Sequence, residues 1–171
     1  SRPRIRVARA KAGKGSGGGQ DFPRIGEAGF SIDIKSAVSL FATLCRLGKA
    51  ANPHFATQAE RIERAVTDGV LDLEALLAGG GRGGKADQAA IERRLDARVL
   101  SFLVLNSARP SVEVDRDRLL AGFEPESWRK ASCPVCGSRP ALSILKGDPV
   151  LRYSLCSCCG CQWLVDRLSC S

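Results

Sequence analysis

Apolar residues recur at helical spacing through the first two thirds of the chain. The clearest case begins after Asp33, which can cap a helix, and runs to about Gly48. The dipeptide Asn52-Pro53 then marks a break in the pattern. This first predicted helix would bury one broad stripe made of Ile34, Val38, Leu40, Phe41, Leu44, Cys45 and Leu47.

A second helix is predicted to begin at a capping box, Thr57-Gln58-Ala59-Glu60, and to end near Gly69. The Thr57 hydroxyl can accept the backbone N–H of Glu60 while the Glu60 side chain reaches back. A short leucine-rich helical turn over residues 72–78 follows. The glycine-rich segment 79–84 is interpreted as a flexible connector, because it lacks the preceding strand and the Gly-Lys-Ser/Thr end of a phosphate-binding loop.

The longest predicted helix is capped by Asp87 and runs to about Ser107. Arg109-Pro110 would end it, since a residue before proline disfavours the helical conformation. One more helix is predicted over residues 114–122. The apolar face of the longest helix comprises Ile91, Leu95, Val99, Phe102 and Leu103. Together these segments predict a small helical domain over residues 21–130.

The helical period disappears from Ser132 onward, where cysteine, glycine and proline become frequent. Two short strands over 141–145 and 150–155 are predicted around a turn at 146–149, and a third strand over 163–168. The boundary between the two patterns lies near residues 124–131. The predicted fold class is therefore α+β, a helical domain followed by a rubredoxin-like (zinc-ribbon-like) metal module over residues 131–171.

The charge is unevenly distributed. The formal net charge is +8, but residues 1–20 alone carry +6 and the remaining 151 residues only +2. The first twenty residues are also rich in glycine, so we expect a disordered basic tail. Such a tail could bind phosphate groups, but a solvated tail is the simpler interpretation, and the nearly neutral body makes nucleic acid an unlikely partner.

Seven of the eight cysteines fall between residues 133 and 170, at metal-ligand spacing. Cys133-Pro-Val-Cys136-Gly and Cys156-Ser-Cys-Cys159-Gly are two C-x-x-C-Gly turns, with nineteen residues between Cys136 and Cys156. Each turn can present two thiolates, and four thiolates make one tetrahedral site. The sequence therefore predicts one metal ion, iron or zinc, bound by Cys133, Cys136, Cys156 and Cys159, since thiolates accept both metals.

The glycine after the second cysteine selects Cys156 and Cys159 over the overlapping pair Cys158 and Cys161. Glycine there permits a positive φ, which turns backbone N–H groups toward the sulfurs. Cys158, Cys161 and Cys170 stay as possible additional ligands or bystanders. Cys45 lies on the apolar stripe of the first helix and is interpreted as a core residue.

No catalytic or cofactor-binding residues are predicted. A closed four-thiolate site leaves no position for substrate or water, so its role is usually structural. His54 is the only histidine and is expected in a loop, which excludes most zinc-enzyme ligand sets. The chain has no run of about eighteen apolar residues and no secretory signal pattern, so the cytoplasm is the expected location.

The cysteine-rich segment resembles a known family, the formate dehydrogenase accessory protein family, FdhE. The resemblance covers about residues 132–171 and rests on Cys133-Pro-Val-Cys-Gly-Ser-Arg-Pro140, Leu151-Arg152-Tyr153, Cys156-x-x-Cys159, Trp163, Arg167 and Cys170-Ser171. It implies rubredoxin-like metal ribbons after a helical domain. Cys133, Cys136, Cys156 and Cys159 would be the ligands of the first ribbon and Cys170 the first cysteine of a second, which is expected to be truncated or absent here.

The resemblance also implies a function, which is a cytoplasmic factor that contacts the catalytic subunit of formate dehydrogenase during maturation. Tyr153, Trp163, Arg139 and Arg152 are candidates for a docking surface, although a ribbon-core role is the stronger prediction for Trp163. Two alternatives stay open. One is a nucleic-acid-binding zinc ribbon with a basic arm, and the other is an iron redox carrier. The oligomeric state is not predicted.

Overall fold

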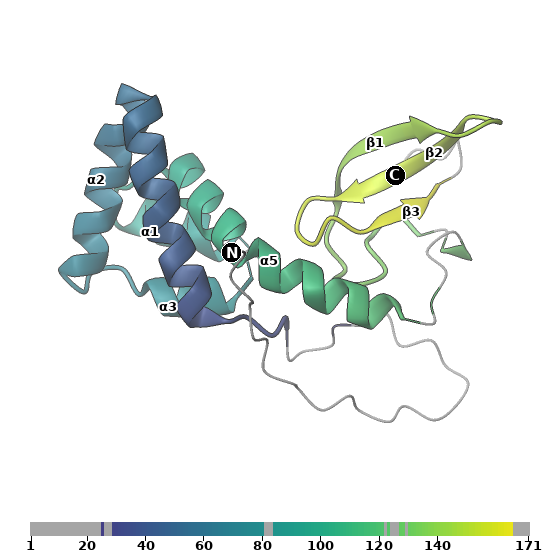
Figure 1. Ribbon diagram of the computed structural model, residues 1–171, viewed down its shortest axis with the longest axis horizontal. Coiled ribbons are helices and arrows are strands. Elements are labelled where there is room, and N and C mark those ends of the chain that lie inside the picture. Colours follow the sequence, from purple (N-terminus) through teal and green to yellow (C-terminus); the bar gives the residue numbers. More distant parts are fainter. Residues whose placement is uncertain are drawn as a thin grey trace, which may run out of the picture. The chain divides into compact units, whose positions relative to one another are not determined.

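The structure is a computed structural model that describes residues 25, 29–80, 84–121, 123, 127–128 and 130–165 (Figure 1). The elements in chain order are α1 (Ile34–Ala51), α2 (Pro53–Thr67), α3 (Leu73–Ala78), α4 (Lys85–Glu92), α5 (Ala97–Leu120), β1 (Pro140–Lys146), β2 (Leu151–Cys156) and β3 (Gln162–Leu164). Helices followed by a small antiparallel sheet confirm the predicted α+β class. The predicted tail at residues 1–20 and Cys170 lie outside the described residues.

The described residues divide into two compact units. The helical unit comprises residues 30–112, and the cysteine unit comprises residues 113–165 with residues 25 and 29. The division falls inside α5, after Val112. The expected limits of separate folding domains, 21–130 and 131–171, stay predictions, because compactness of a unit says nothing about folding alone.

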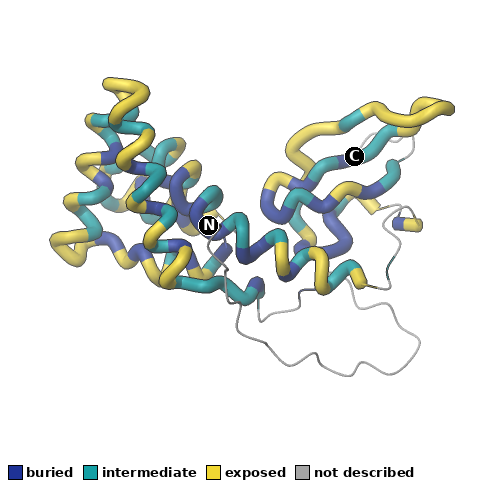
Figure 2. Tube along the Cα trace, in the orientation of Figure 1, coloured by how far each residue is buried: buried dark blue, intermediate teal, exposed yellow. Residues whose placement is uncertain are grey.

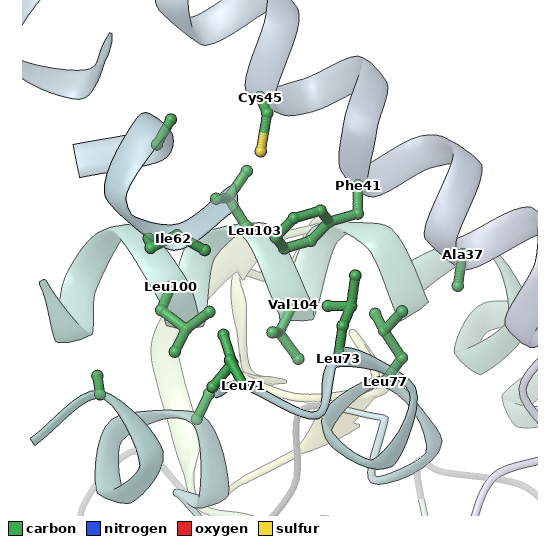
Figure 3. Close-up of a cluster of buried hydrophobic side chains, with 13 residues drawn as sticks. Ala37, Phe41, Cys45, Ile62, Leu71, Leu73, Leu77, Leu100, Leu103 and Val104 are labelled. Carbon is green, nitrogen blue, oxygen red and sulfur yellow. The ribbon is translucent and has the colours of Figure 1, made fainter. Parts of the chain in front are cut away.

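The core of the helical unit is a single cluster of aliphatic side chains around Phe41 (Figure 3). Cys45 is fully buried within it, which confirms its predicted core role. Leucines from the segment 71–77 and from α5 point into the same space in Figure 3. Because aromatic residues are only 5% of the chain, this core depends on aliphatic packing.

Helix α1 starts as predicted, since the Asp33 carboxylate accepts the Ser36 backbone N–H at 3.2 Å. It does not end at Gly48, however, and continues to Ala51. A Cβ at Gly48 would lie 2.2 Å from the Phe55 ring. Gly48 therefore lets α2 approach α1 closely and is not a stop signal.

The prediction that the second helix begins at a capping box at Thr57 is wrong. Helix α2 begins at Pro53, where the Asn52 side chain accepts the backbone N–H groups of His54 and Phe55 at 2.9 and 3.1 Å. Proline at the first helical position suits this start, because its fixed φ is helical and its missing N–H is not needed there. The predicted loop position of His54 is also wrong, since it is an exposed residue in the first turn of α2.

The long helix predicted from Asp87 is instead two helices. Helix α4 begins after Gly84 and ends at Glu92. Arg94 then adopts φ 54°, the Leu95 N–H donates to the Ala90 carbonyl, and the Arg94 N–H to the Ile91 carbonyl. These two bonds form a Schellman motif with arginine in the usual place of glycine, so the sequence carries no stop signal there.

The predicted end at Pro110 is wrong too, because α5 runs through it to Leu120. Ala108 and Val112, on either side of the proline, are fully buried. Burial of these flanking side chains holds the segment helical although Pro110 cannot donate a backbone hydrogen bond. The separate helix predicted over 114–122 is the last part of α5.

The three strands form an antiparallel sheet in the order β1-β2-β3, close to the predicted ranges. Residues 166–168 of the third predicted strand lie outside the described residues. Pro140 pairs with Cys156 and Leu142 with Leu155, so Ala141 is an extra residue in β1. The β2 strand thus ends in the second cysteine turn, and β1 begins four residues after the first. The sheet holds the two turns beside each other.

Candidate metal centre

The four predicted cysteines lie together in the cysteine unit. Their Sγ atoms are all within 4.8 Å of one another, and each side chain is at most 3% exposed. The Sγ–Sγ distances are 3.6 Å for Cys133–Cys159, 3.5 Å for Cys136–Cys156 and 3.7 Å for Cys136–Cys159. A regular tetrahedron with metal–sulfur bonds of about 2.3 Å has sulfur–sulfur edges of about 3.8 Å. The four cysteines are therefore positioned to bind one tetrahedral metal ion.

The two cysteine turns repeat each other in their backbone hydrogen bonds. In the first turn Cys133 donates to the Ser138 carbonyl and accepts from Gly137, both at 2.9 Å. In the second turn Cys156 donates to the Cys161 carbonyl at 2.9 Å and accepts from Gly160 at 3.2 Å. The same local sequence thus gives the same loop twice.

The glycines adopt the conformation that the sequence requires, with φ 74° at Gly137 and 69° at Gly160. A side chain at either position would strain the turn. In the second turn the N–H groups of Cys158 and Cys159 point to the Cys156 sulfur at 3.4 Å each. Such N–H···S contacts stabilise a thiolate, as predicted.

Hydrogen bonds among the thiols perturb their acidity. The pKa of Cys136 is lowered, chiefly because the Cys133 thiol donates to it. The same bond raises the pKa of Cys133 to about 12, and the bonds to Cys133 raise the pKa values of Cys156 and Cys159. One thiolate is favoured among three thiols, so metal binding must displace protons and weakens as pH falls.

The remaining cysteines of the cysteine unit are buried beside the group of four but are not members of it. By the repeat of the turns, Cys158 stands where the first turn has the buried Val135, and Cys161 where it has Ser138. Cys158 is 5% exposed and Cys161 1% exposed. The Cys161 thiol points to the carbonyl of Gln162 at 3.7 Å. Neither position corresponds to Cys133 or Cys136 of the first turn.

Residues far away in sequence hold the turns in place. The Arg116 guanidinium donates to the Cys159 carbonyl at 2.9 Å, across 43 positions, and the Ile25 N–H to the Val135 carbonyl at 3.0 Å. Trp128 donates its indole N–H to the Ser132 carbonyl at 2.7 Å. Sequence reasoning missed all three. Only Trp128, a rare residue just before the first turn, carried a signal that could have been used.

Trp163 is fully buried, and its indole N–H donates to the Lys130 carbonyl at 3.0 Å. This confirms its ribbon-core role and removes it from the candidate docking surface. Tyr153 and Arg152 are half-buried and Arg139 is exposed. Within the described residues, the four-cysteine group is the only cluster of three or more potential metal ligands, and His54 is not part of it.

Comparisons with known proteins agree with this geometry. Residues 132–167 match the model of the FdhE central domain, a stretch that contains both turns and all three strands. This segment is therefore similar to the central domain of FdhE proteins. The helices of the described residues include none long and apolar enough to cross a membrane. No solved structure matches the chain.

Three curated relatives, each called Protein FdhE homolog, are similar over part of the chain. The Aquifex aeolicus protein is 31% identical over 83 residues, which are 47% of this chain and 29% of that protein. The Rhizobium meliloti protein is 33% identical over 66 residues, which are 35% of this chain and 22% of that protein. The Pseudomonas aeruginosa protein is 36% identical over 53 residues, which are 29% of this chain and 17% of that protein. The FdhE similarity thus spans less than a third of each relative.

Proposed function

We propose that the chain is an accessory factor in the maturation of a formate dehydrogenase and that it contacts the catalytic subunit of that enzyme in the cytoplasm. The observation that carries the proposal is the FdhE central-domain match over residues 132–167, with four buried cysteines placed together inside it. The partner comes from the family resemblance. The nearly neutral charge of residues 21–171 argues against nucleic acid as the main ligand.

In this proposal Cys133, Cys136, Cys156 and Cys159 bind one ion of iron or zinc. Four thiolates complete the tetrahedral shell, which leaves no coordination position for water or substrate. The ion therefore stabilises the module and catalyses nothing, and the chain is not an enzyme. One ion per chain is expected, because Cys158 and Cys161 occupy the places of Val135 and Ser138 in the repeated turn.

A capture experiment tests the contact with the enzyme. Purified catalytic subunit is passed over immobilised wild-type chain and over Cys133→Ala, with Cys45→Ala as the matched control, since Cys45 is a buried cysteine of the other unit. We expect wild type and Cys45→Ala to retain the subunit and Cys133→Ala, which lacks a ligand, to lose both the metal and the subunit. Equal capture by a metal-free Cys133→Ala chain would contradict a metal-dependent contact.

Metal analysis with an absorption spectrum of natively produced chain separates the remaining possibilities. A colourless protein with one zinc per chain supports a purely structural site. A coloured iron protein that is reversibly reduced by one electron would favour the redox carrier instead. Two ions per chain would mean that further cysteines, such as Cys170, take part as ligands.

A further inference from the structure

The sheet of the cysteine unit has one apolar face that no described residue buries. Side chains alternate along a strand, and directly paired residues share a face. Leu142 pairs with Leu155, Ile144 with Tyr153, Lys146 with Leu151, Tyr153 with Leu164 and Leu155 with Gln162. The open sheet face is therefore formed by Leu142, Ile144, Leu151, Tyr153, Leu155 and Leu164, and none of these six is buried.

Side-chain contacts agree with this assignment. The Lys146 ammonium lies 4.1 Å from the Tyr153 ring centre and 2.9 Å from the Gln162 side-chain oxygen, so these three share the open face. On the opposite face Arg152 donates to the Ser143 hydroxyl at 3.1 Å. That face contains Ser154 and Trp163, which are buried, whereas Leu145 at its outer end is 62% exposed.

The exposure of the open sheet face is high for aliphatic side chains. Leu142 is 52% exposed and Leu151 40%, and Figure 2 shows the outer part of the β1–β2 hairpin in yellow on both strands. Several apolar residues gathered on one exposed face indicate an interaction site, whereas single exposed leucines are ordinary. The hairpin differs in this respect from helix α1. Leu47 is 58% exposed there, but it is the one exposed large apolar residue of that helix.

Strand β1 also has a free edge, because it is the outer strand of the order β1-β2-β3 and pairs only with β2 among the described strands. Edge strands are normally guarded by proline, bulges or charges. Here Pro140, the extra residue Ala141 and Lys146 guard only the two ends. The central residues 142–145 offer outward backbone N–H and carbonyl groups, as every second residue of an antiparallel edge does.

The charges of the hairpin select the partner. Arg139, Lys146 and Arg152 are its cations, and none of them forms an ion pair with a described residue. The one acidic residue between 139 and 165 is Asp148, in the turn. A second copy of the same hairpin would place like charges together, whereas an acidic segment would complement them.

We propose that the open sheet face and the β1 edge bind an extended segment of a partner protein in which apolar and acidic residues alternate, and that this segment adds a fourth strand. Its backbone would pair with residues 142–145. Its apolar side chains would cover Leu142 and Ile144, and its carboxylates would meet Lys146 and Arg139. This inference rests on the proposed function for the identity of the partner, the formate dehydrogenase catalytic subunit, but not for the chemistry of the segment.

The test uses the full metal-loaded chain and two probes. The first probe is a synthetic ten-residue peptide of alternating valine and glutamate, compared with the same peptide carrying lysine for glutamate. The second is the purified catalytic subunit. Leu142→Glu is the test variant, and Leu47→Glu is the control, because it places the same charge at an equally exposed leucine of the helical unit. Unchanged metal content verifies that each variant is folded.

We expect the glutamate peptide to bind wild type and Leu47→Glu alike, at least about tenfold more weakly to Leu142→Glu, and in preference to the lysine peptide. Hydrogen exchange should slow at residues 142–145 when it binds. Equal binding to Leu142→Glu, or no binding of the glutamate peptide, would overturn the inference. So would a wild-type dimer that Leu142→Glu converts to a monomer, since a second copy would then cover the face.

The two probes separate this inference from the proposed function. If the peptide behaves as expected and the catalytic subunit is not captured, the surface is assigned and the proposed enzyme partner is wrong. If the subunit is captured equally by wild type and Leu142→Glu, the proposed function stands and the open sheet face is not the contact. Preference for the lysine peptide would also overturn the inference, because the cations would then not select the segment.

Discussion

At the scale of single residues, the cysteines of the two turns are of two kinds, those in the group of four and those beside it. In the sequence, only the position of glycine separates the two kinds. Cys156-x-x-Cys159 and Cys158-x-x-Cys161 overlap, and both could bind a metal by spacing. The conformations of Gly137 and Gly160 make the first pair equivalent to Cys133 and Cys136. A backbone requirement thus selects the pair that joins Cys133 and Cys136 in one group, where the thiols themselves do not.

Serine substitutions at four positions of the second turn check this division. We expect Cys156→Ser and Cys159→Ser to lower the metal content well below one ion per chain, because serine is a poor ligand for a soft site. Cys158→Ser and Cys161→Ser should keep one ion but lower the free energy of unfolding, because a hydroxyl group would replace a buried thiol. Metal analysis after gel filtration measures both. Loss of the ion from Cys158→Ser or Cys161→Ser alone would reverse the assignment.

At the scale of elements, the structure departs from the sequence prediction where packing or an unusual residue overrides a local signal. The grouping of the four cysteines was predictable because two short motifs specify it. The end of α4 was not, since Arg94 takes a left-handed conformation that usually indicates glycine. Arg116 was not either, because its bond to the Cys159 carbonyl joins positions 43 residues apart.

The two prolines of the helical unit show the same contrast between a local signal that the structure follows and one that packing overrides. Pro53 stands at the first position of α2, where proline is favourable, and Pro110 stands inside α5, where it is not. We expect Pro110→Ala to raise the free energy of unfolding by about 1–2 kcal/mol, because alanine restores a helical N–H donor and avoids the ring clash.

Pro53→Ala is the matched control and should leave the free energy of unfolding unchanged or lower it by up to about 1 kcal/mol. Urea unfolding monitored by circular dichroism measures both variants. A Pro110→Ala chain no more stable than wild type would mean that the ring's own packing outweighs the lost hydrogen bond in α5.

At the scale of the whole molecule, the two units depend on different sources of stability. The helical unit has a contiguous aliphatic core. The cysteine unit has a cluster of buried thiols and a small sheet with one face that no described residue buries. Small modules of this kind usually need a metal to stay folded.

Removal of the metal should therefore affect the units unequally. We expect a chelator to abolish amide protection in β1, β2 and β3 while α1, α2 and the first part of α5 stay protected. Hydrogen exchange with and without chelator, read by mass spectrometry, measures this. Loss of protection in both units together would show that the helical core cannot stand without the cysteine unit.

The cluster of sulfurs joins the start and the end of one stretch of chain, since residues 133–136 precede β1 and residues 156–159 begin at the last residue of β2. A bound ion would act on the hairpin between them as a cross-link does, by lowering the entropy of the unfolded loop. A hairpin whose two ends are cross-linked in this way needs no buried side chains at its tip to stay folded. Its outer residues could then change from one relative to another without loss of the fold, so each relative could match the surface to its own partner.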